Sequence, residues 1–74
     1  MTFGQWLAHL RAVRQLSQTD LARRTGLRQG SISQWEADAR QPGRLVLLKL
    51  SSGLGVDLNT LNTPGAPIEQ VIGS

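Results

Sequence analysis

Apolar residues recur at steps of three and four along this chain, in short segments that turn-forming and helix-capping residues separate. The clearest segment is the first, with apolar side chains at Phe3, Trp6, Leu7, Leu10 and Val13. This spacing places all five side chains on one face of a helix over about residues 3–15, which Thr2 is suited to cap. A chain of such segments folds only if its short helices bury these faces against one another.

A second helix is predicted over about residues 18–25. Ser17 and Asp20 form a capping-box pattern at its start, with Asp in place of the usual Glu. Gly26 follows its last turn and suits the left-handed conformation in which many helices end. The residue types at both ends therefore predict the bounds of this helix.

A third helix, over about residues 29–37, carries Ile32 and Trp35 on its inner face. A fourth is expected over about residues 44–53. Pro42 precedes it and suits the start of a helix, where its missing N–H has no partner to lose. The segment between the two helices reads as a loop.

A short fifth helix contains Leu58 and Leu61, and Asp57 is placed to cap it. From Asn62 onward, prolines and glycines interrupt regular structure. Five short helices in a chain of 74 residues predict one all-α domain, a compact helical bundle.

The composition argues against several classes of protein. The chain has no cysteine, and His9 is its only histidine, so we expect no metal and no cofactor. No apolar run approaches the roughly 18 residues of a membrane span, and the N-terminus lacks a signal-peptide pattern, so a cytoplasmic location is expected. The sequence offers no nucleophile–histidine pair, close carboxylate pair or phosphate-binding loop, so no enzyme is predicted.

Positive charge is concentrated in the first part of the chain. The formal net charge is +3 and the isoelectric point is about 11.2. All seven arginines lie in this part, at Arg11, Arg14, Arg23, Arg24, Arg28, Arg40 and Arg44. The acidic residues among them are Asp20, Glu36 and Asp38. This distribution is typical of a protein that binds a polyanion, although a net charge of +3 also fits a merely basic domain.

A helix-turn-helix is predicted by the way four residues are spaced along the chain, in the pattern Gln18-x3-Ala22-x3-Gly26-x5-Ile32. Gln18 opens the second helix, and the small Ala22 lets the third helix cross at close range. Gly26 permits the tight turn, and Ile32 fills the angle between the two helices. Such an arrangement leaves one side of the third helix exposed, and a helix fits the major groove of B-DNA.

This segment resembles the helix-turn-helix domains of phage repressors and Cro proteins, also called the xenobiotic-response-element family. Further matching blocks are Leu7-x2-Leu-Arg11, Leu16-Ser-Gln18-x2-Leu-Ala22-x3-Gly26-Leu27, Ile32-Ser-Gln-Trp-Glu36, Arg40-x-Pro42 and Leu54-Gly-Val56. The resemblance implies a lambda-repressor-like fold, with a DNA-binding domain over residues 1–61 and its helix-turn-helix at 17–37. Residues 62–74 are expected to form a tail that is either flexible or in contact with a second subunit.

The resemblance also implies a role for each polar residue of the third helix. Gln29, at its start, would lie against a base edge, where a glutamine pairs bidentately with adenine. Ser31 and Gln34 would be the next base contacts. Arg28 would reach a guanine or a phosphate.

Outside that helix, the resemblance implies phosphate contacts and one structural ion pair. Gln18 would hold a phosphate and brace the glutamine that opens the third helix. Arg40 and Arg44 would grip the DNA backbone from the loop that follows. An ion pair between Arg11 and Glu36 would tie the first helix to the third.

Two positions depart from the family pattern. Arg28 stands where a Ser or Thr cap is usual, so the third helix is expected to begin without a side-chain cap. Gly30 stands where a side chain usually faces the DNA. Two interpretations of Gly30 stay open: closer approach of the backbone to DNA, or the loss of one contact.

Two aromatic positions and one histidine are interpreted as structural or inert. Trp6 and Trp35 are candidates for base-stacking platforms, but their spacing with apolar neighbours favours the core. His9 falls off the apolar stripe and is expected to be exposed.

Double-stranded DNA is the expected partner, and a repressor that binds a palindromic operator as a homodimer is the leading hypothesis. One half-site discriminates too little against a genome of competing sites. The alternative is a protein-interaction module, an antitoxin or an adaptor, whose partner is a toxin or a further C-terminal domain. Leu45, Val46 and Leu48 broaden the apolar face of the fourth helix, either to cover the core or to contact a subunit. Ile68, Val71 and Ile72 have helical spacing over a single turn. They either dock on a partner subunit or belong to a disordered end or to the start of a linker to a further domain, and a disordered end is expected.

Overall fold

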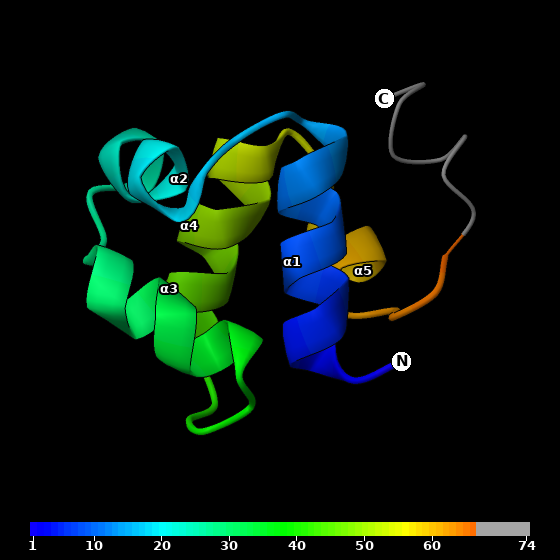
Figure 1. Cartoon of the computed structure of the whole chain (residues 1–74). Helices are drawn as coiled ribbons and strands as arrows, with labels where there is room; N and C mark the ends of the chain where they lie inside the picture. Colours follow the sequence, from blue (N-terminus) through cyan, green and yellow to red (C-terminus); the bar gives the residue numbers. More distant parts are fainter. Residues whose placement is uncertain (67–74) are drawn as a thin grey trace.

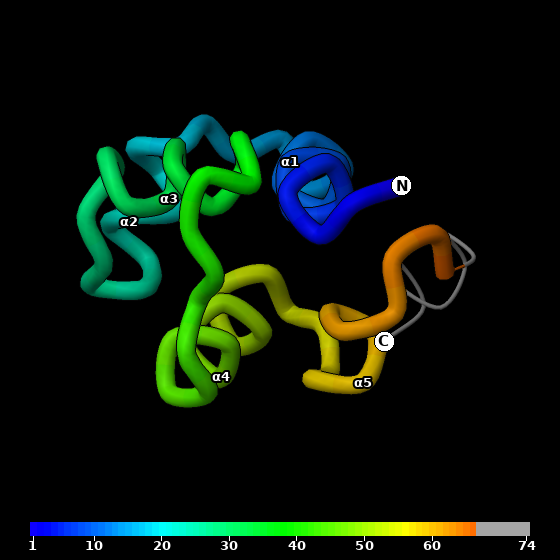
Figure 2. The backbone as a smooth tube through the Cα atoms, turned by 90° about the horizontal axis from the view of Figure 1, so that it is seen from below, coloured from blue at the N-terminus to red at the C-terminus, as the bar shows by residue number. Residues whose placement is uncertain are grey.

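The computed structural model describes residues 1–66, which fold into five α-helices and contain no strand. The helices are α1 (Phe3–Val13), α2 (Gln18–Thr25), α3 (Gln29–Glu36), α4 (Arg44–Leu54) and α5 (Leu58–Leu61) (Figure 1). The predicted all-α bundle is confirmed. In the view of Figure 2, α1, α2 and α3 lie along one side of the molecule, and α4 and α5 along the other.

Local capping interactions set the starts of α1, α2 and α5. Ser17 and Asp20 form the predicted capping box, with the Ser17 hydroxyl and the Asp20 carboxylate each accepting an N–H of the other residue at 3.0 Å. Thr2 caps α1 in the same reciprocal way, with Gln5 as its partner. Asp57 accepts the Thr60 N–H at 2.7 Å, as the sequence predicted for the start of α5.

The end of α1 and the role of Pro42 differ from the prediction. Helix α1 ends at Val13 because Gln15 adopts a left-handed conformation (φ 57°), which lets the Leu16 N–H bond to the Arg11 carbonyl. Helix α4 begins at Arg44, and Gly43 is its N-cap. The extended backbone of Gly43 (ψ 174°) therefore leaves Pro42 outside the helix it was expected to open.

The core gathers one or more residues from every helix. Its fully buried side chains are Trp6, Leu7, Leu10, Leu21, Ile32, Leu50, Leu54 and Leu61. Both tryptophans are buried, as predicted, and the Trp6 indole N–H donates to the Thr60 carbonyl at 3.0 Å. The prediction for His9 was wrong: its ring is half-buried and stacks on that of Trp6, with centroids 5.6 Å apart, because i and i+3 side chains are neighbours on a helix.

Helices α1 and α3 approach each other closely at Gly4. A Cβ atom at this position would lie 2.6 Å from the Trp35 carbonyl oxygen, so only glycine fits. Just beyond α3, Asp38 adopts a left-handed conformation (φ 58°) and its carboxylate accepts the Gly4 N–H at 2.9 Å and the Thr2 hydroxyl at 2.6 Å. The end of α3 is thereby fastened to the start of α1.

The tail lies largely beyond this description. The expectations for Ile68, Val71 and Ile72 concern residues outside the described range. Within residues 1–66, none of the helices has the length and apolar character needed to cross a bilayer.

Candidate nucleic-acid interface

The turn between α2 and α3 sets the angle at which α3 is presented. Gly26 is left-handed (φ 72°), and its N–H closes the last turn of α2 on the Ala22 carbonyl. Ala22 and Ile32 are buried between the two helices. Arg28 is the N-cap of α3 and makes no side-chain capping bond, as the sequence indicated.

The Arg11–Glu36 ion pair joins α1 to α3. The contact is bidentate, with Nε to Oε2 at 2.8 Å and Nη2 to Oε1 at 3.1 Å. Arg11 also donates to the Leu16 carbonyl at 2.8 Å, which ties in the loop before α2. The hydrogen bond to Glu36 raises the pKa of Arg11 above its ordinary value, so the guanidinium carries its charge at every physiological pH.

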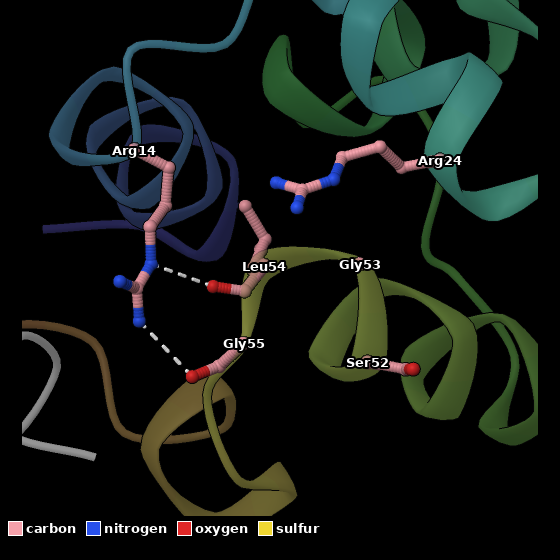
Figure 3. Close-up of a pocket in the computed structure, with 6 residues that line it drawn as sticks. All are labelled: Arg14, Arg24, Ser52, Gly53, Leu54 and Gly55. Atoms are coloured by element: carbon pink, nitrogen blue, oxygen red, sulfur yellow. Dashed lines mark hydrogen bonds between the residues drawn. The ribbon is translucent and has the colours of Figure 1, made fainter.

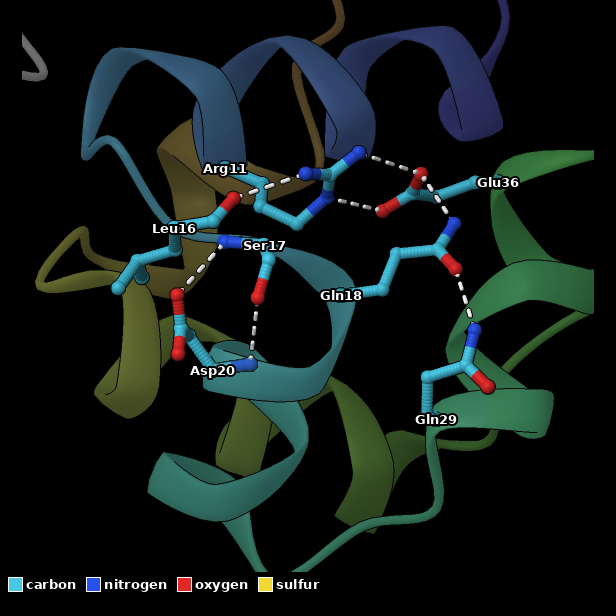
Figure 4. A network of polar contacts seen from close by, with 7 residues as sticks. All are labelled: Arg11, Leu16, Ser17, Gln18, Asp20, Gln29 and Glu36. Atoms are coloured by element: carbon cyan, nitrogen blue, oxygen red, sulfur yellow. Dashed lines mark hydrogen bonds and ion pairs between the residues drawn. The ribbon is translucent and has the colours of Figure 1, made fainter.

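Two glutamines extend this ion pair to the surface (Figure 4). Gln18 Nε2 donates to Glu36 Oε1 at 3.0 Å, and Gln29 Nε2 donates to Gln18 Oε1 at 2.6 Å. A continuous chain of side chains therefore runs from the half-buried ion pair to the exposed start of α3. We call these four residues, Arg11, Glu36, Gln18 and Gln29, the glutamine relay.

The exposed face of α3 consists of small and polar residues. Ile32 and Trp35 face the core, whereas Gln29, Gly30 and Ser33 are exposed. A Cβ atom on Gly30 would meet no atom within 4 Å, so the helix surface is open there. The backbone of α3 is therefore accessible at Gly30.

The other predicted base contacts differ in accessibility. Gln34 is exposed, whereas Ser31 is half-buried at the edge of the helix. Sequence reasoning did not include Ser33, which follows Gln29 by four residues and therefore shares its face. That spacing was the signal that would have identified it.

Exposed arginines flank α3 in the sequence. Arg28 precedes α3, and Arg40 and Arg44 lie in and after the loop that follows it. An Arg40 Nη1 atom lies 3.5 Å from Gln34 Oε1, which directs this arginine toward the α3 surface. The carboxylate in the same loop, Asp38, bonds to the start of α1, as described above.

A separate pocket lies at the end of α4, lined by Arg14, Arg24 and residues 52–55 (Figure 3). Arg14 donates to the Leu54 carbonyl at 2.8 Å and to the Gly55 carbonyl at 3.0 Å. It thus caps the C-terminal end of α4, where carbonyl groups lack partners within the helix. The pocket shares no lining residue with the glutamine relay.

A helix held across a glycine turn, with its outer face polar and arginines at both ends, defines a helix-turn-helix DNA-binding domain. The chain belongs to the helix-turn-helix family, whose model matches residues 10–61, and its type is that of the phage repressors and Cro proteins. It is therefore a DNA-binding domain of a transcription regulator. Neither a curated protein nor a solved structure was found that is significantly similar to the chain.

Proposed function

We propose that this protein is a sequence-specific repressor, which binds a palindromic operator as a homodimer with α3 in the major groove. It acts in the cytoplasm, on nucleoid DNA. The observation that carries the proposal is the glutamine relay, because an exposed side chain held by a bonded network is preorganised to contact a partner. A surface glutamine that only contacts water would not require these hydrogen bonds to hold its side chain.

Base recognition falls to the exposed edge of α3. Gln29 pairs bidentately with adenine through its amide, and Gln34 contacts the next base pairs. Gly30 lies between them and lets the helix backbone come close to the groove floor. Ser31, at the half-buried edge, contributes a marginal base contact.

Phosphate contacts fix the position of α3 on the duplex. Gln18 has a second amide N–H beyond the one bonded to Glu36, and it donates this to a phosphate oxygen. Arg40 and Arg44 hold the backbone on one flank, and Arg28 on the other. These phosphate contacts set the orientation of the protein on the duplex and much of its affinity. The contacts to base edges determine which sequence is preferred.

Two copies are needed for useful specificity. Each mismatched base pair costs about 1–3 kcal/mol, so a half-site of a few base pairs separates poorly from a genome. The domain has principal extents of 29 × 22 × 20 Å. Two such domains fit side by side on half-sites about 34–36 Å apart, one turn of the duplex.

A protein-interaction role, as an antitoxin or adaptor, is the second candidate. Leu45 and Leu48 on α4 are 68% and 44% exposed, which is unusual for large apolar side chains near each other. Such a role would place a protein partner on α4. It is compatible with DNA binding through α3.

The test uses duplexes that the protein itself selects from a random-sequence pool. Gln29→Ala should weaken binding to the selected duplex by about 1–3 kcal/mol and relax preference at one base pair. Arg40→Ala should weaken all duplexes alike and lower the salt slope by about one. Asn59→Ala and Arg23→Ala are matched controls, because both residues are exposed and neither is among the proposed DNA contacts. Equal losses on selected and scrambled duplexes for Gln29→Ala would remove Gln29 from base recognition.

A further inference from the structure

The hydrogen bonds of the glutamine relay all lead toward Glu36. Gln29 donates to Gln18, Gln18 donates to Glu36, and Glu36 also accepts from Arg11. A glutamine amide has a donor end and an acceptor end, and a half-turn about its last bond exchanges the two. A neighbouring group must therefore determine which end of each amide faces which partner.

Glu36 makes this selection, because an ionised carboxylate only accepts hydrogen bonds. Gln18 has to turn its NH2 group toward Glu36, which leaves its oxygen for the next residue. Gln29 then has to turn its own NH2 group toward Gln18. Arg11 offers only donors, so its two bonds to Glu36 add no alternative polarity.

The consequence appears at the exposed end of the relay. Gln29 is left with its oxygen and one N–H, and Figure 4 shows this oxygen pointing away from Gln18. Adenine offers the N6 donor and the N7 acceptor side by side in the major groove. An amide with its donor and acceptor exchanged would meet these two groups in reversed order, as adenine presents them from the opposite strand.

We propose that Glu36 is a positioning residue for base recognition, which acts through Gln18 and fixes the orientation in which Gln29 reads adenine. The inference rests on the proposed function. It gives the ion pair a second task, since Glu36 then governs which strand of an A·T pair carries the preferred adenine. A purely structural ion pair would have no influence on that choice.

The experiment measures a preference ratio with the whole chain. The probe is the duplex selected by the wild-type protein, compared with a duplex in which the base pair assigned to Gln29 is reversed from A·T to T·A. Glu36→Gln replaces the acceptor-only group by an amide that both donates and accepts, so both relay orientations become possible. The ratio of the two affinities should fall about tenfold, within the range that one bidentate contact discriminates.

A second variant leaves the ion pair intact. Gln18→Met keeps a side chain of similar length but breaks the relay between Glu36 and Gln29, and the ratio should fall to a similar extent. Loss of the Gln18 phosphate contact lowers both affinities and does not alter their ratio. In the Gln18→Met background, Glu36→Gln should change the ratio no further.

The outcomes separate the inference from the proposed function. An unchanged ratio in either single variant, or a further fall in the double variant, overturns the role of Glu36. If Glu36→Gln does not fold, an unchanged ratio for Gln18→Met still overturns the role of Glu36, because that role acts through Gln18. A Gln29→Ala variant that keeps the wild-type ratio would instead contradict the proposed function itself.

Discussion

Among single residues, Arg11 is central to the structure of the candidate interface. Its guanidinium contacts Glu36 twice and the Leu16 carbonyl once, so it joins α1, α3 and the loop before α2. The side chains of the ion pair are only 21% and 9% exposed, for Arg11 and Glu36 in turn. Such a pair differs from a solvated surface pair, whose contribution is close to zero.

Removing one partner should therefore be costly. Arg11→Met leaves the Glu36 carboxylate poorly solvated and without its cation, and we expect a loss of about 3 kcal/mol in the free energy of unfolding. Urea denaturation followed by circular dichroism measures it. Arg23→Met is the matched control, because Arg23 is exposed on α2. A loss below about 1 kcal/mol for Arg11→Met would show that the pair behaves as a surface pair.

Two glycines show how differently one residue type acts within the helices. Gly4 in α1 faces the backbone carbonyls at the end of α3, whereas Gly30 in α3 faces open space. The same substitution should consequently have opposite effects at the two sites. Comparing the two substitutions therefore distinguishes the effect of packing on stability from the effect of intrinsic helix propensity.

Gly4→Ala should destabilise the fold by about 1–3 kcal/mol, because the added methyl group forces α1 away from α3. Gly30→Ala should stabilise it by about 0.5–1 kcal/mol, because alanine favours the helix and the methyl group meets nothing. Thermal unfolding measures both changes. If Gly30 serves close approach to the groove, Gly30→Ala should bind the selected duplex more weakly despite its greater stability. Unchanged or tighter binding would contradict that role.

Helix caps give the fold a defined sensitivity to acid. The Ser17 N–H lowers the pKa of Asp20, and the Thr60 N–H lowers the pKa of Asp57. A carboxyl with a lowered folded-state pKa stabilises the fold fully above its unfolded value, about 3.9 for aspartate, and loses this effect as the pH falls through the folded value. We therefore expect stability to decline below about pH 4.

Asp57→Asn tests this expectation, because asparagine still caps α5 but does not titrate near pH 4. The difference in unfolding free energy between wild type and variant should shrink as the pH falls from 6 to 2. Chemical denaturation at each pH measures it. Two curves that stay parallel over this range would mean that the Asp57 cap does not respond to protonation.

Across the whole molecule, the sequence predicted what depends on neighbouring residues and missed what depends on distant ones. The five helices and the left-handed Gly26 follow from local spacing and capping signals. The bonds of Asp38 to the start of α1, and of Arg14 to the end of α4, join residues more than thirty positions apart. Gln15 was missed for another reason, since glutamine gives no signal for the left-handed conformation that it adopts.

At the candidate site, the family resemblance anticipated two contacts that local spacing does not reveal. The resemblance implied the Arg11–Glu36 pair and the brace between Gln18 and Gln29, and both contacts are present. It did not imply the bond from Gln18 to Glu36, which turns two separate contacts into one relay. That bond depends on how three helices meet, and no spacing along the chain reveals it. The DNA contacts themselves stay predictions.

Dimeric binding makes a prediction about operator geometry. Inserting about five base pairs, half a helical turn, between the halves of the selected operator rotates one half-site to the opposite face of the duplex. Binding should fall to the level of a single half-site. A gel-shift titration measures this, with a same-length insertion outside the operator as the control. Equal affinity for both duplexes would mean that the protein binds as a monomer.

The most direct test of the central claim, that Gln29 on α3 reads a base in the major groove, exchanges a single ring atom of the DNA. Replacing adenine by 7-deazaadenine, one position at a time, deletes the N7 acceptor and leaves base pairing intact. At one adenine of each half-site the change should weaken wild-type binding by about 1 kcal/mol or more, and it should leave Gln29→Ala binding unaltered. Equal losses in both proteins at every position, or no loss in either, would contradict the claim.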